Sequence, residues 1–256
     1  MRYIAILFII YISVSILLYF KQSSLLYFPT PSISSNYPTI KLQNGGESIN
    51  IFVLNQKSED AIIYFGGNAE SMANSCDYFA KLFPQSRVYL MDYRGYGDSS
   101  GEPKEDEIYS DALALYDKIR VNHKSISIIG RSLGSGVATY VASQREVSKL
   151  ALITPFDSIV EVAKGIYPIF PISLLLTQRY ESKKRVKDIK APTLIVMAQN
   201  DTLITNERTH SLIEAFAPNQ LTVETIKDRG HSDITSHERY PKVIQDFIGN
   251  KKKDEN

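Results

Sequence analysis

Short apolar runs alternate with amphipathic segments along most of the chain. The apolar runs have the length and the β-branched content of buried strands, and they cover residues 49–54, 61–65, 87–91, 126–129, 150–153, 193–198 and 221–226. Segments with apolar residues at helical spacing separate them, at 69–83, 104–121, from 137 onward, 206–216 and 237–248. Because this alternation builds a parallel sheet covered on both faces, the sequence predicts an α/β fold with a mostly parallel central sheet and helices on both faces.

An uncharged apolar run from Tyr3 to Phe20 lies between Arg2 and Lys21 near the start of the chain. Its length reaches the threshold for a membrane-spanning helix and exceeds the apolar core of a signal peptide. No small-x-small cleavage site follows, so the sequence favours an uncleaved single-pass membrane anchor in residues 1–22. A cleaved signal and a buried helix are the alternatives. The free amine and Arg2 outweigh Lys21, which favours a cytoplasmic N-terminus with the rest of the chain outside.

One segment, residues 156–185, interrupts the strand–helix alternation. It carries Gly165, Pro168, Pro171 and an apolar piece from Ile166 to Leu176. The segment is too long for a simple turn. The sequence predicts a small cap over the carboxyl ends of the strands, where an α/β sheet binds its ligand. The alternative is a surface hairpin that is buried only for stability.

Composition and charge narrow the classes of partner. The chain is 43% hydrophobic and 22% charged, which is ordinary for a globular protein, and residues 23–256 are expected to form one domain. The net charge of +1 supplies no basic field, so a nucleic-acid partner is excluded. Cys76 is the only cysteine in the sequence, so an internal disulfide cannot form.

The motif with the clearest chemistry is Gly-x-Ser-x-Gly, from Gly130 to Gly134. It lies between a predicted strand and a predicted helix, and this context turns a common pattern into a candidate nucleophile elbow. A sharp strand-to-helix turn lifts the Ser132 hydroxyl clear of both elements, and the glycines let the two elements approach closely. The alternative is a plain glycine-rich connection.

A serine hydroxyl needs a base, and the base needs an orienting acid. His231 and Asp201 each follow a predicted strand, so they lie at the same edge of the sheet as Ser132. The chain order Ser132, Asp201, His231 is that of the alpha/beta hydrolases. The other candidates fit less well, because of their position or their closeness to His231, and they are His123, His210, His237, Asp157, Asp228 and Asp233.

An oxyanion hole requires backbone N–H groups close to the nucleophile. The Leu133 amide lies at a predicted helix N-terminus, where the partial positive charge favours an anion. Gly66-Gly67-Asn68 follows an early strand, and its glycines permit close approach of the backbone, so the Asn68 amide is the second predicted donor. A tight turn with Asn68 as a helix N-cap is the alternative.

Several stretches together resemble the alpha/beta hydrolase superfamily, close to its BEM46-like, ABHD13-like group. They are residues 25–29, 63–69, 92–101, 130–136, 154–158, 200–201 and 230–231, with 92–101 the most specific. The resemblance implies an alpha/beta-hydrolase fold with Ser132 as nucleophile, Asp201 as acid and His231 as base. Gly66 departs from the histidine usual in that group, which implies a less firmly held oxyanion loop. Ala198 stands where the group usually has glycine.

These observations predict a membrane-anchored serine hydrolase that cleaves a lipophilic acyl ester or thioester without a metal or cofactor. A serine peptidase of the same fold is an alternative, although no amine-binding acidic cluster or additional domain favours it. A non-catalytic membrane protein that uses the fold for binding or scaffolding is a further alternative, because fold alone does not determine function.

Overall fold

The computed structural model describes residues 1–55 and 58–249, so the last residues of the predicted 23–256 domain lie outside the described part. An eight-stranded sheet is its centre, in the order β1-β2-β4-β3-β5-β6-β7-β8. The strands are β1 Thr39–Asn44, β2 Glu47–Leu54, β3 Asp60–Phe65, β4 Arg87–Met91, β5 Ser125–Arg131, β6 Leu150–Ile153, β7 Thr193–Ala198 and β8 Leu221–Ile226. All neighbours from β4 to β8 are parallel, and only β1–β2 and β2–β4 are antiparallel. The predicted mostly parallel sheet is confirmed.

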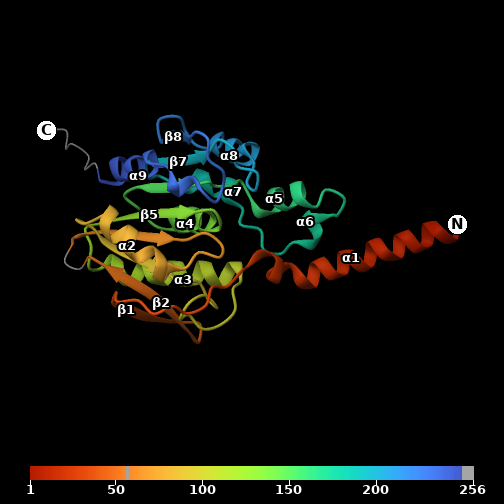
Figure 1. Ribbon diagram of the computed structural model, residues 1–256, viewed down its shortest axis with the longest axis horizontal. Helices are drawn as coiled ribbons and strands as arrows, with labels where there is room; N and C mark the ends of the chain where they lie inside the picture. Colours follow the sequence, from red (N-terminus) through yellow and green to blue (C-terminus); the bar gives the residue numbers. More distant parts are fainter. Residues whose placement is uncertain (56–57, 250–256) are drawn as a thin grey trace.

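Helices cover both faces of this sheet (Figure 1). They are α1 Arg2–Leu26, α2 Met72–Leu82, α3 Glu105–Arg120, α4 Leu133–Gln144, α5 Ile159–Ile166, α6 Ile172–Leu175, α7 Ser182–Arg185, α8 Asn206–Ile213 and α9 Arg239–Gly249. Alternate residues of β3 point to opposite faces, as strand geometry requires. Ile63 and Phe65 join one apolar core with α3 and α4, whereas Ile62 and Tyr64 join the other with α2 and α9.

The structure adds one strand that the sequence pattern did not predict. β1 is an edge strand in which Leu42 alone is buried, so it has no apolar run to indicate it. Several helix bounds also differ from prediction: α2 begins at Met72 instead of residue 69, and α4 begins at Leu133 instead of residue 137. α8 ends at Ile213, and α9 begins at Arg239 because the His237 side chain accepts the Arg239 N–H at 3.1 Å, just before the helix.

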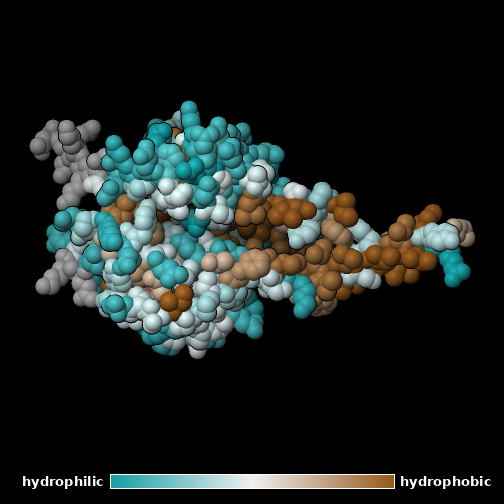
Figure 2. Space-filling view, viewed as in Figure 1, coloured by the Kyte–Doolittle hydropathy of each residue, from teal (hydrophilic) through white to brown (hydrophobic). Residues whose placement is uncertain are grey.

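The apolar helix α1 extends away from the sheet, and α5 and α6 lie beside its sheet-proximal half (Figure 1). Among the described residues, α1 is the one helix long and apolar enough to cross a membrane. The space-filling view shows its apolar surface continuing onto the neighbouring part of the molecule (Figure 2). Residues 156–185, where the sequence predicts a cap, contain α5, α6 and α7.

Candidate active site

Ser132 occupies a strained turn between β5 and α4. Its backbone has φ +50° and ψ −119°, a conformation that is costly for a residue with a side chain. Two glycines permit the turn: a Cβ on Gly130 would lie 2.4 Å from the Gly134 carbonyl oxygen, and one on Gly134 would lie 2.0 Å from the Phe65 carbonyl oxygen. Backbone strain at the carboxyl end of a strand, as at Ser132 after β5, is typical of a functional residue.

The structure brings the three residues of the predicted triad together. His231 Nε2 lies 2.8 Å from Ser132 Oγ, and His231 Nδ1 lies 2.8 Å from Asp201 Oδ2. The other carboxylate oxygen of Asp201 accepts the N–H groups of Leu203, at 3.0 Å, and Ile204, at 2.8 Å. These bonds fix the carboxylate and, through it, the imidazole ring. A histidine with its Nδ1–H on the acid presents the Nε2 lone pair to the hydroxyl.

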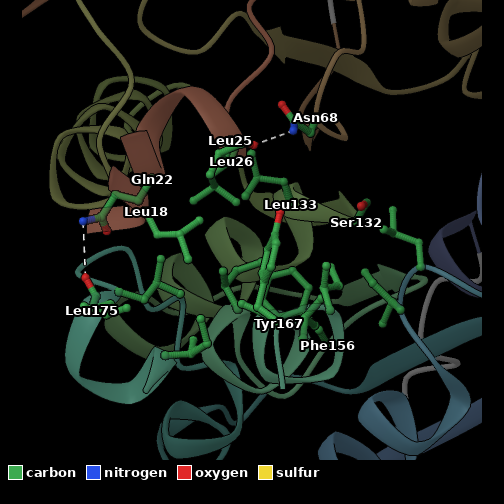
Figure 3. A pocket seen from close by; sticks show the side chains of 18 of the residues that line it. Leu18, Gln22, Leu25, Leu26, Asn68, Ser132, Leu133, Phe156, Tyr167 and Leu175 are labelled. Carbon is green, nitrogen blue, oxygen red and sulfur yellow. Dashed lines mark hydrogen bonds between the residues drawn. The ribbon is translucent and has the colours of Figure 1, made fainter. Parts of the chain in front are cut away.

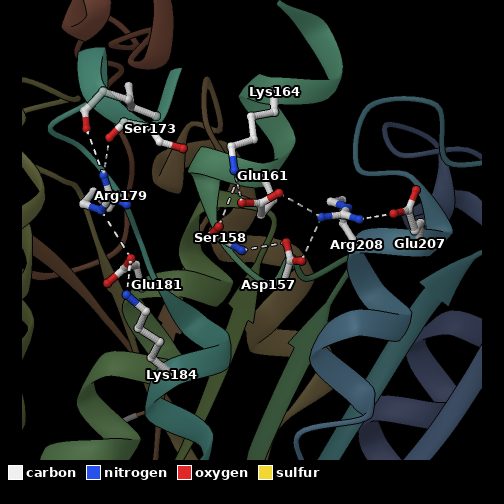
Figure 4. Close-up of polar contacts among 11 residues, drawn as sticks. Asp157, Ser158, Glu161, Lys164, Ser173, Arg179, Glu181, Lys184, Glu207 and Arg208 are labelled. Atoms are coloured by element: carbon white, nitrogen blue, oxygen red, sulfur yellow. Dashed lines mark hydrogen bonds and ion pairs between the residues drawn. The ribbon is translucent and has the colours of Figure 1, made fainter. Parts of the chain in front are cut away.

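Two of the three competing carboxylates, Asp157 and Asp233, have other partners. Asp157 lies 3.1 Å from Arg208 Nη1 and accepts the Ser158 N–H, contacts that are visible in Figure 4. Asp233 accepts the Gly230 N–H at 2.7 Å. The sequence argument against His123 also agrees with the structure, because this buried residue contacts the Tyr89 hydroxyl and precedes β5 at the edge opposite Ser132.

Asn68 and Leu133, the predicted oxyanion residues, line the same cavity as Ser132 (Figure 3). Leu133 is the first residue of α4, so its amide belongs to the positive end of the helix dipole. The loop that carries Asn68 lies directly against the nucleophile, since a Cβ on Gly67 would be 3.6 Å from Ser132 Cβ. Both predicted oxyanion residues therefore lie beside Ser132.

The Asn68 side chain clamps this loop to the end of α1. Its Nδ2 donates to the Leu26 carbonyl at 2.5 Å, and its Oδ1 accepts the Phe28 N–H at 2.9 Å and the Tyr96 hydroxyl at 2.7 Å. No local pattern in the sequence predicts these contacts. The partners come from residues 25–29 and 92–101. Both stretches resemble the same family, and their presence in one sequence is the available indication of these contacts.

Gly66, where the resemblance implies a less firmly held loop, and Gly67 have contacts of their own in the structure. The Tyr93 hydroxyl donates to the Gly66 carbonyl at 2.8 Å in a buried position. The Gly67 N–H donates to Glu70 Oε2, also at 2.8 Å. A Cβ on Gly66 would lie 2.3 Å from the Met72 Cε atom, so a larger residue would need the methionine to move.

A partly buried ion pair between Arg131 and Glu70 connects the loop that carries Asn68 to the Ser132 turn and to His231. Arg131, which precedes Ser132, lies 3.0 Å from Glu70 Oε2, and its other terminal nitrogen donates to the His231 carbonyl at 3.4 Å. Glu70 also accepts the Tyr64 hydroxyl at 2.7 Å. Burial, followed by the negative charge of Glu70, raises the pKa of Tyr64 well above its usual range, so the hydroxyl remains a donor.

The cavity above Ser132 is mostly apolar and has a volume of about 240 Å³. Its walls come from α1, from residues 156–176 and from the loop before α8 (Figure 3). The α1 wall includes Leu18, Gln22 and Leu25. Within residues 1–55 and 58–249, no group of His, Cys, Asp or Glu side chains is arranged to hold a metal ion.

Comparisons with known proteins agree with this geometry. A family profile described as alpha/beta hydrolase fold matches residues 60–174. The uncharacterized protein Rv2307c of Mycobacterium tuberculosis is 32% identical over 182 residues, which cover 69% of this chain and 64% of that one. The lysophosphatidylserine lipase ABHD12 of Danio rerio is 29% identical over 227 residues, covering 75% of this chain and 59% of the lipase. The chain thus spans less than two thirds of these relatives.

Solved structures show the same architecture at low identity. The Pyrococcus furiosus esterase Pf2001 has a TM-score of 0.68 and 17% identity, covering 87% of this chain and 97% of the esterase. The enol-lactonase of Burkholderia xenovorans LB400 has a TM-score of 0.64 and 16% identity, covering 82% of this chain and 100% of the lactonase. Together with the sheet order and the strained Ser132 turn, these similarities show that the chain has the alpha/beta-hydrolase fold.

Proposed function

We propose that this protein is a serine hydrolase that cleaves an acyl ester or thioester, with Ser132 as nucleophile, His231 as base and Asp201 as orienting acid. One observation carries the proposal: two 2.8 Å contacts connect Ser132 Oγ, His231 and the Asp201 carboxylate in an unbroken chain. The hydroxyl at one end of that chain faces an apolar cavity. The esterase and lipase names of the similar proteins support acyl esters as the substrate class.

The mechanism follows from this arrangement. His231 Nε2 takes the hydroxyl proton as Ser132 Oγ attacks the acyl carbonyl, and Asp201 stabilises the imidazolium that forms. The backbone amides of Asn68 and Leu133 donate to the oxyanion. Collapse of the tetrahedral intermediate transfers the proton from His231 to the leaving alcohol or thiol. Water then attacks the acyl-serine by the same route and releases the acid.

The lining of the cavity supports a lipophilic acyl group. Aliphatic side chains of α1, α5 and α6 face the cavity on the side away from the triad, among them Leu18, Ile166 and Ile172. Each methylene transferred from water into such surroundings contributes about 0.8 kcal/mol, so preference is expected to rise with chain length until the cavity is full. Residues 156–185 would then act as a small cap on the acyl-binding side.

We also propose that α1 remains on the mature protein and anchors it to a membrane. Gln22 accepts the Thr177 N–H at 2.8 Å and donates to the Leu175 carbonyl at 3.4 Å, and Leu18 forms part of the cavity wall. A cleaved signal would take these contacts away from the site. The hydrolase domain is predicted to start at residue 23. With the N-terminus in the cytoplasm, the anchor would place this domain on the opposite side of the membrane. The stretches that resemble the BEM46-like, ABHD13-like group, with 92–101 the most specific, support placing the chain in that narrower group.

Activity-based labelling tests the proposal. The full chain in detergent should react with a fluorophosphonate probe and hydrolyse esters or thioesters from a panel of short and long acyl chains and lysophospholipids. Labelling accompanied by cleavage of peptides alone would indicate a peptidase instead. A folded chain that neither labels nor turns over any of these substrates would contradict hydrolase function and leave a binding or scaffolding role.

A further inference from the structure

An uncharged hairpin projects from the hydrolase body beside α1. Residues 165–178 contain no Asp, Glu, Lys or Arg, and they include the turn between α5 and α6 and α6 itself. At its outer side, the Ile169 side chain is 72% exposed and that of Leu174 is 83% exposed. Water-exposed aliphatic side chains this close together mark an interaction surface.

Contacts along α1 fix how far the hairpin reaches. The Tyr11 hydroxyl donates to the Ile169 carbonyl at 3.0 Å. The Tyr11 ring stacks on the Phe170 ring, with 5.3 Å between the ring centroids. Gln22 bonds to the other end of the hairpin, at Leu175 and Thr177. Eleven positions separate Tyr11 from Gln22, which is about 16 Å along a helix and about half of a ~30 Å hydrocarbon core.

We propose that the 165–178 hairpin inserts into one leaflet of the bilayer alongside α1, so that its tip lies near the middle of the hydrocarbon core. The insertion rests on the membrane anchoring by α1 proposed above. The occupant of the exposed apolar surface is therefore lipid. The apolar surface of α1 continues onto this side of the body, as Figure 2 shows, so one membrane would cover both.

Several backbone groups of the hairpin are paired or lack a donor, although the Ile169 N–H has no partner among the described residues. An unpaired N–H or C=O group in hydrocarbon costs several kcal/mol. Pro168 and Pro171 have no N–H to satisfy. The Tyr167 N–H donates to Ala163 at 2.8 Å, and the Phe170 N–H donates to Tyr167 at 3.2 Å.

Charged side chains lie at the base of the hairpin and along α6, where Arg179 Nη1 donates to the Ser173 carbonyl at 3.2 Å (Figure 4). Lys164, just before it, lies 2.6 Å from Glu161, and Arg179, just after it, lies 3.2 Å from Glu181. The hairpin is thus apolar at its tip and charged where it meets the body, which is the profile of an element that enters a bilayer from one side. The base would lie at the level of the lipid headgroups.

Insertion has a consequence for substrate access. The cavity lies between α1 and the segment that contains the hairpin, with Leu18 on one wall and Ile166 on the other. If both elements lie in one leaflet, an acyl chain reaches Ser132 directly from the hydrocarbon core. The lipid substrate of the proposed hydrolase would therefore enter sideways from the membrane instead of from water.

Tryptophan fluorescence tests the insertion, because the sequence has no tryptophan and a single introduced one reports its own depth. Ile169→Trp, Leu174→Trp, Phe8→Trp on α1 and Val121→Trp on the body would be placed separately in the full chain. Each variant would be reconstituted in phosphatidylcholine vesicles whose acyl chains are brominated near the bilayer centre. Val121 is the matched control, because it is 83% exposed and follows α3 at the opposite edge of the sheet.

The expected result is loss of most emission for the tryptophans at 8 and 169, a smaller loss at 174, which lies beside Leu175 at the Gln22 end of the hairpin, and no loss at 121. Quenching at 8 without quenching at 169 and 174 would overturn the hairpin insertion while leaving the anchor in place. No quenching at 8, 169 or 174 would overturn both. A Ser132→Ala background should give the same pattern, so failure of the proposed hydrolase function would not imitate either outcome.

A charge at the tip tests the access route. Ile169→Asp should lower turnover of a vesicle-embedded acyl ester severalfold and leave turnover of a small soluble ester unchanged, because Ile169 does not line the cavity. Val121→Asp, the control, should alter neither. Equal turnover of the embedded ester by Ile169→Asp and the native chain would contradict the sideways route.

Discussion

The side-chain nitrogen of Asn68 lies 2.5 Å from the carbonyl oxygen of Leu26, the last residue of the apolar helix α1. This contact joins the predicted oxyanion loop to the element proposed as the membrane anchor. Because a misplacement of about 1 Å near the reacting atoms can cost two orders of magnitude in rate, the end of α1 is in a position to affect catalysis.

Asn68→Asp should lower kcat by roughly tenfold to a hundredfold and change KM little. The variant retains oxygens that accept the Phe28 N–H and the Tyr96 hydroxyl, but it loses the donor to Leu26 and sets a carboxylate against a carbonyl. Steady-state kinetics on a soluble ester provide the measurement. Asn122→Asp, the same change at an exposed site beyond α3, is the control. A rise in KM at unchanged kcat would mean that the clamp serves substrate binding.

Ser132→Ala should abolish fluorophosphonate labelling and ester turnover while the fold is retained. Only the attacking oxygen is removed, and alanine leaves the strained turn and its neighbouring glycines in place. Gel fluorescence of the labelled chain, with circular dichroism for the fold, makes the measurement. Ser143→Ala on the same helix is the control and should label normally. Undiminished labelling of Ser132→Ala would place the nucleophile elsewhere.

His231→Ala and Asp201→Asn should each reduce turnover by roughly 10³–10⁴, and the double variant should be little worse than the more damaging single one. Because the three groups act as a unit, loss of one member already removes most of the rate enhancement that the triad supplies. Loss of a second member therefore lowers the rate little further. Rates of the two single variants and the double variant on one ester complete the cycle. A rate for Asp201→Asn within a few-fold of the native rate would mean that another carboxylate, such as Asp228, orients the base.

The inner parallel strands could be predicted closely because their apolar runs record burial on both faces. β7, buried along its whole length, has the predicted bounds, whereas the edge strand β1, with Leu42 as its one buried residue, has no such apolar run. Ser132, Asp201 and His231 could be placed at one edge because each follows a strand, and the structure brings them together; their catalytic roles stay predictions. The hydrogen bond from Asn68 to the Leu26 carbonyl depends on where the end of α1 lies in the folded chain. No local sequence pattern predicts that position.

Asp92 should make the protein less stable as the pH rises from about 4 to 6. Burial raises the pKa of this carboxyl to about 6, although the Asn50 side chain donates to it at 2.9 Å. The folded chain therefore binds a proton that the unfolded chain releases, so the free energy of unfolding falls through this pH window. The loss is about 3 kcal/mol by the free-energy equivalent of a pKa change.

Urea unfolding in detergent at a series of pH values measures this dependence. Asp92→Asn cannot ionise and should remove the decline between about pH 4 and 6. Asp246→Asn, the same change at an exposed site on α9, is the control and should retain it. A decline of the same size in Asp92→Asn and the native chain would assign the pH dependence to another group.

Two truncations of α1 should separate its role as an anchor from its role as a cavity wall. Deletion of residues 2–14 removes most of the apolar run but keeps Leu18 and Gln22, which line the cavity. This variant should hydrolyse a small soluble ester normally and lose most turnover of an ester embedded in vesicles. Deletion of residues 2–22 also removes the wall and the Gln22 bonds to Leu175 and Thr177, so turnover of the soluble ester should fall as well.

The point variant Gln22→Ala serves as the control for the longer deletion, since it removes the bonds of Gln22 to Leu175 and Thr177 and leaves the span intact. It should lower soluble-ester turnover less than the 2–22 deletion and leave vesicle binding unchanged. Equal loss by both truncations on both substrates would mean that α1 is needed for folding as a whole. Normal turnover of both esters by both truncations would mean that α1 neither forms a necessary wall nor delivers substrate, and a polar substrate taken from water would then fit the site better.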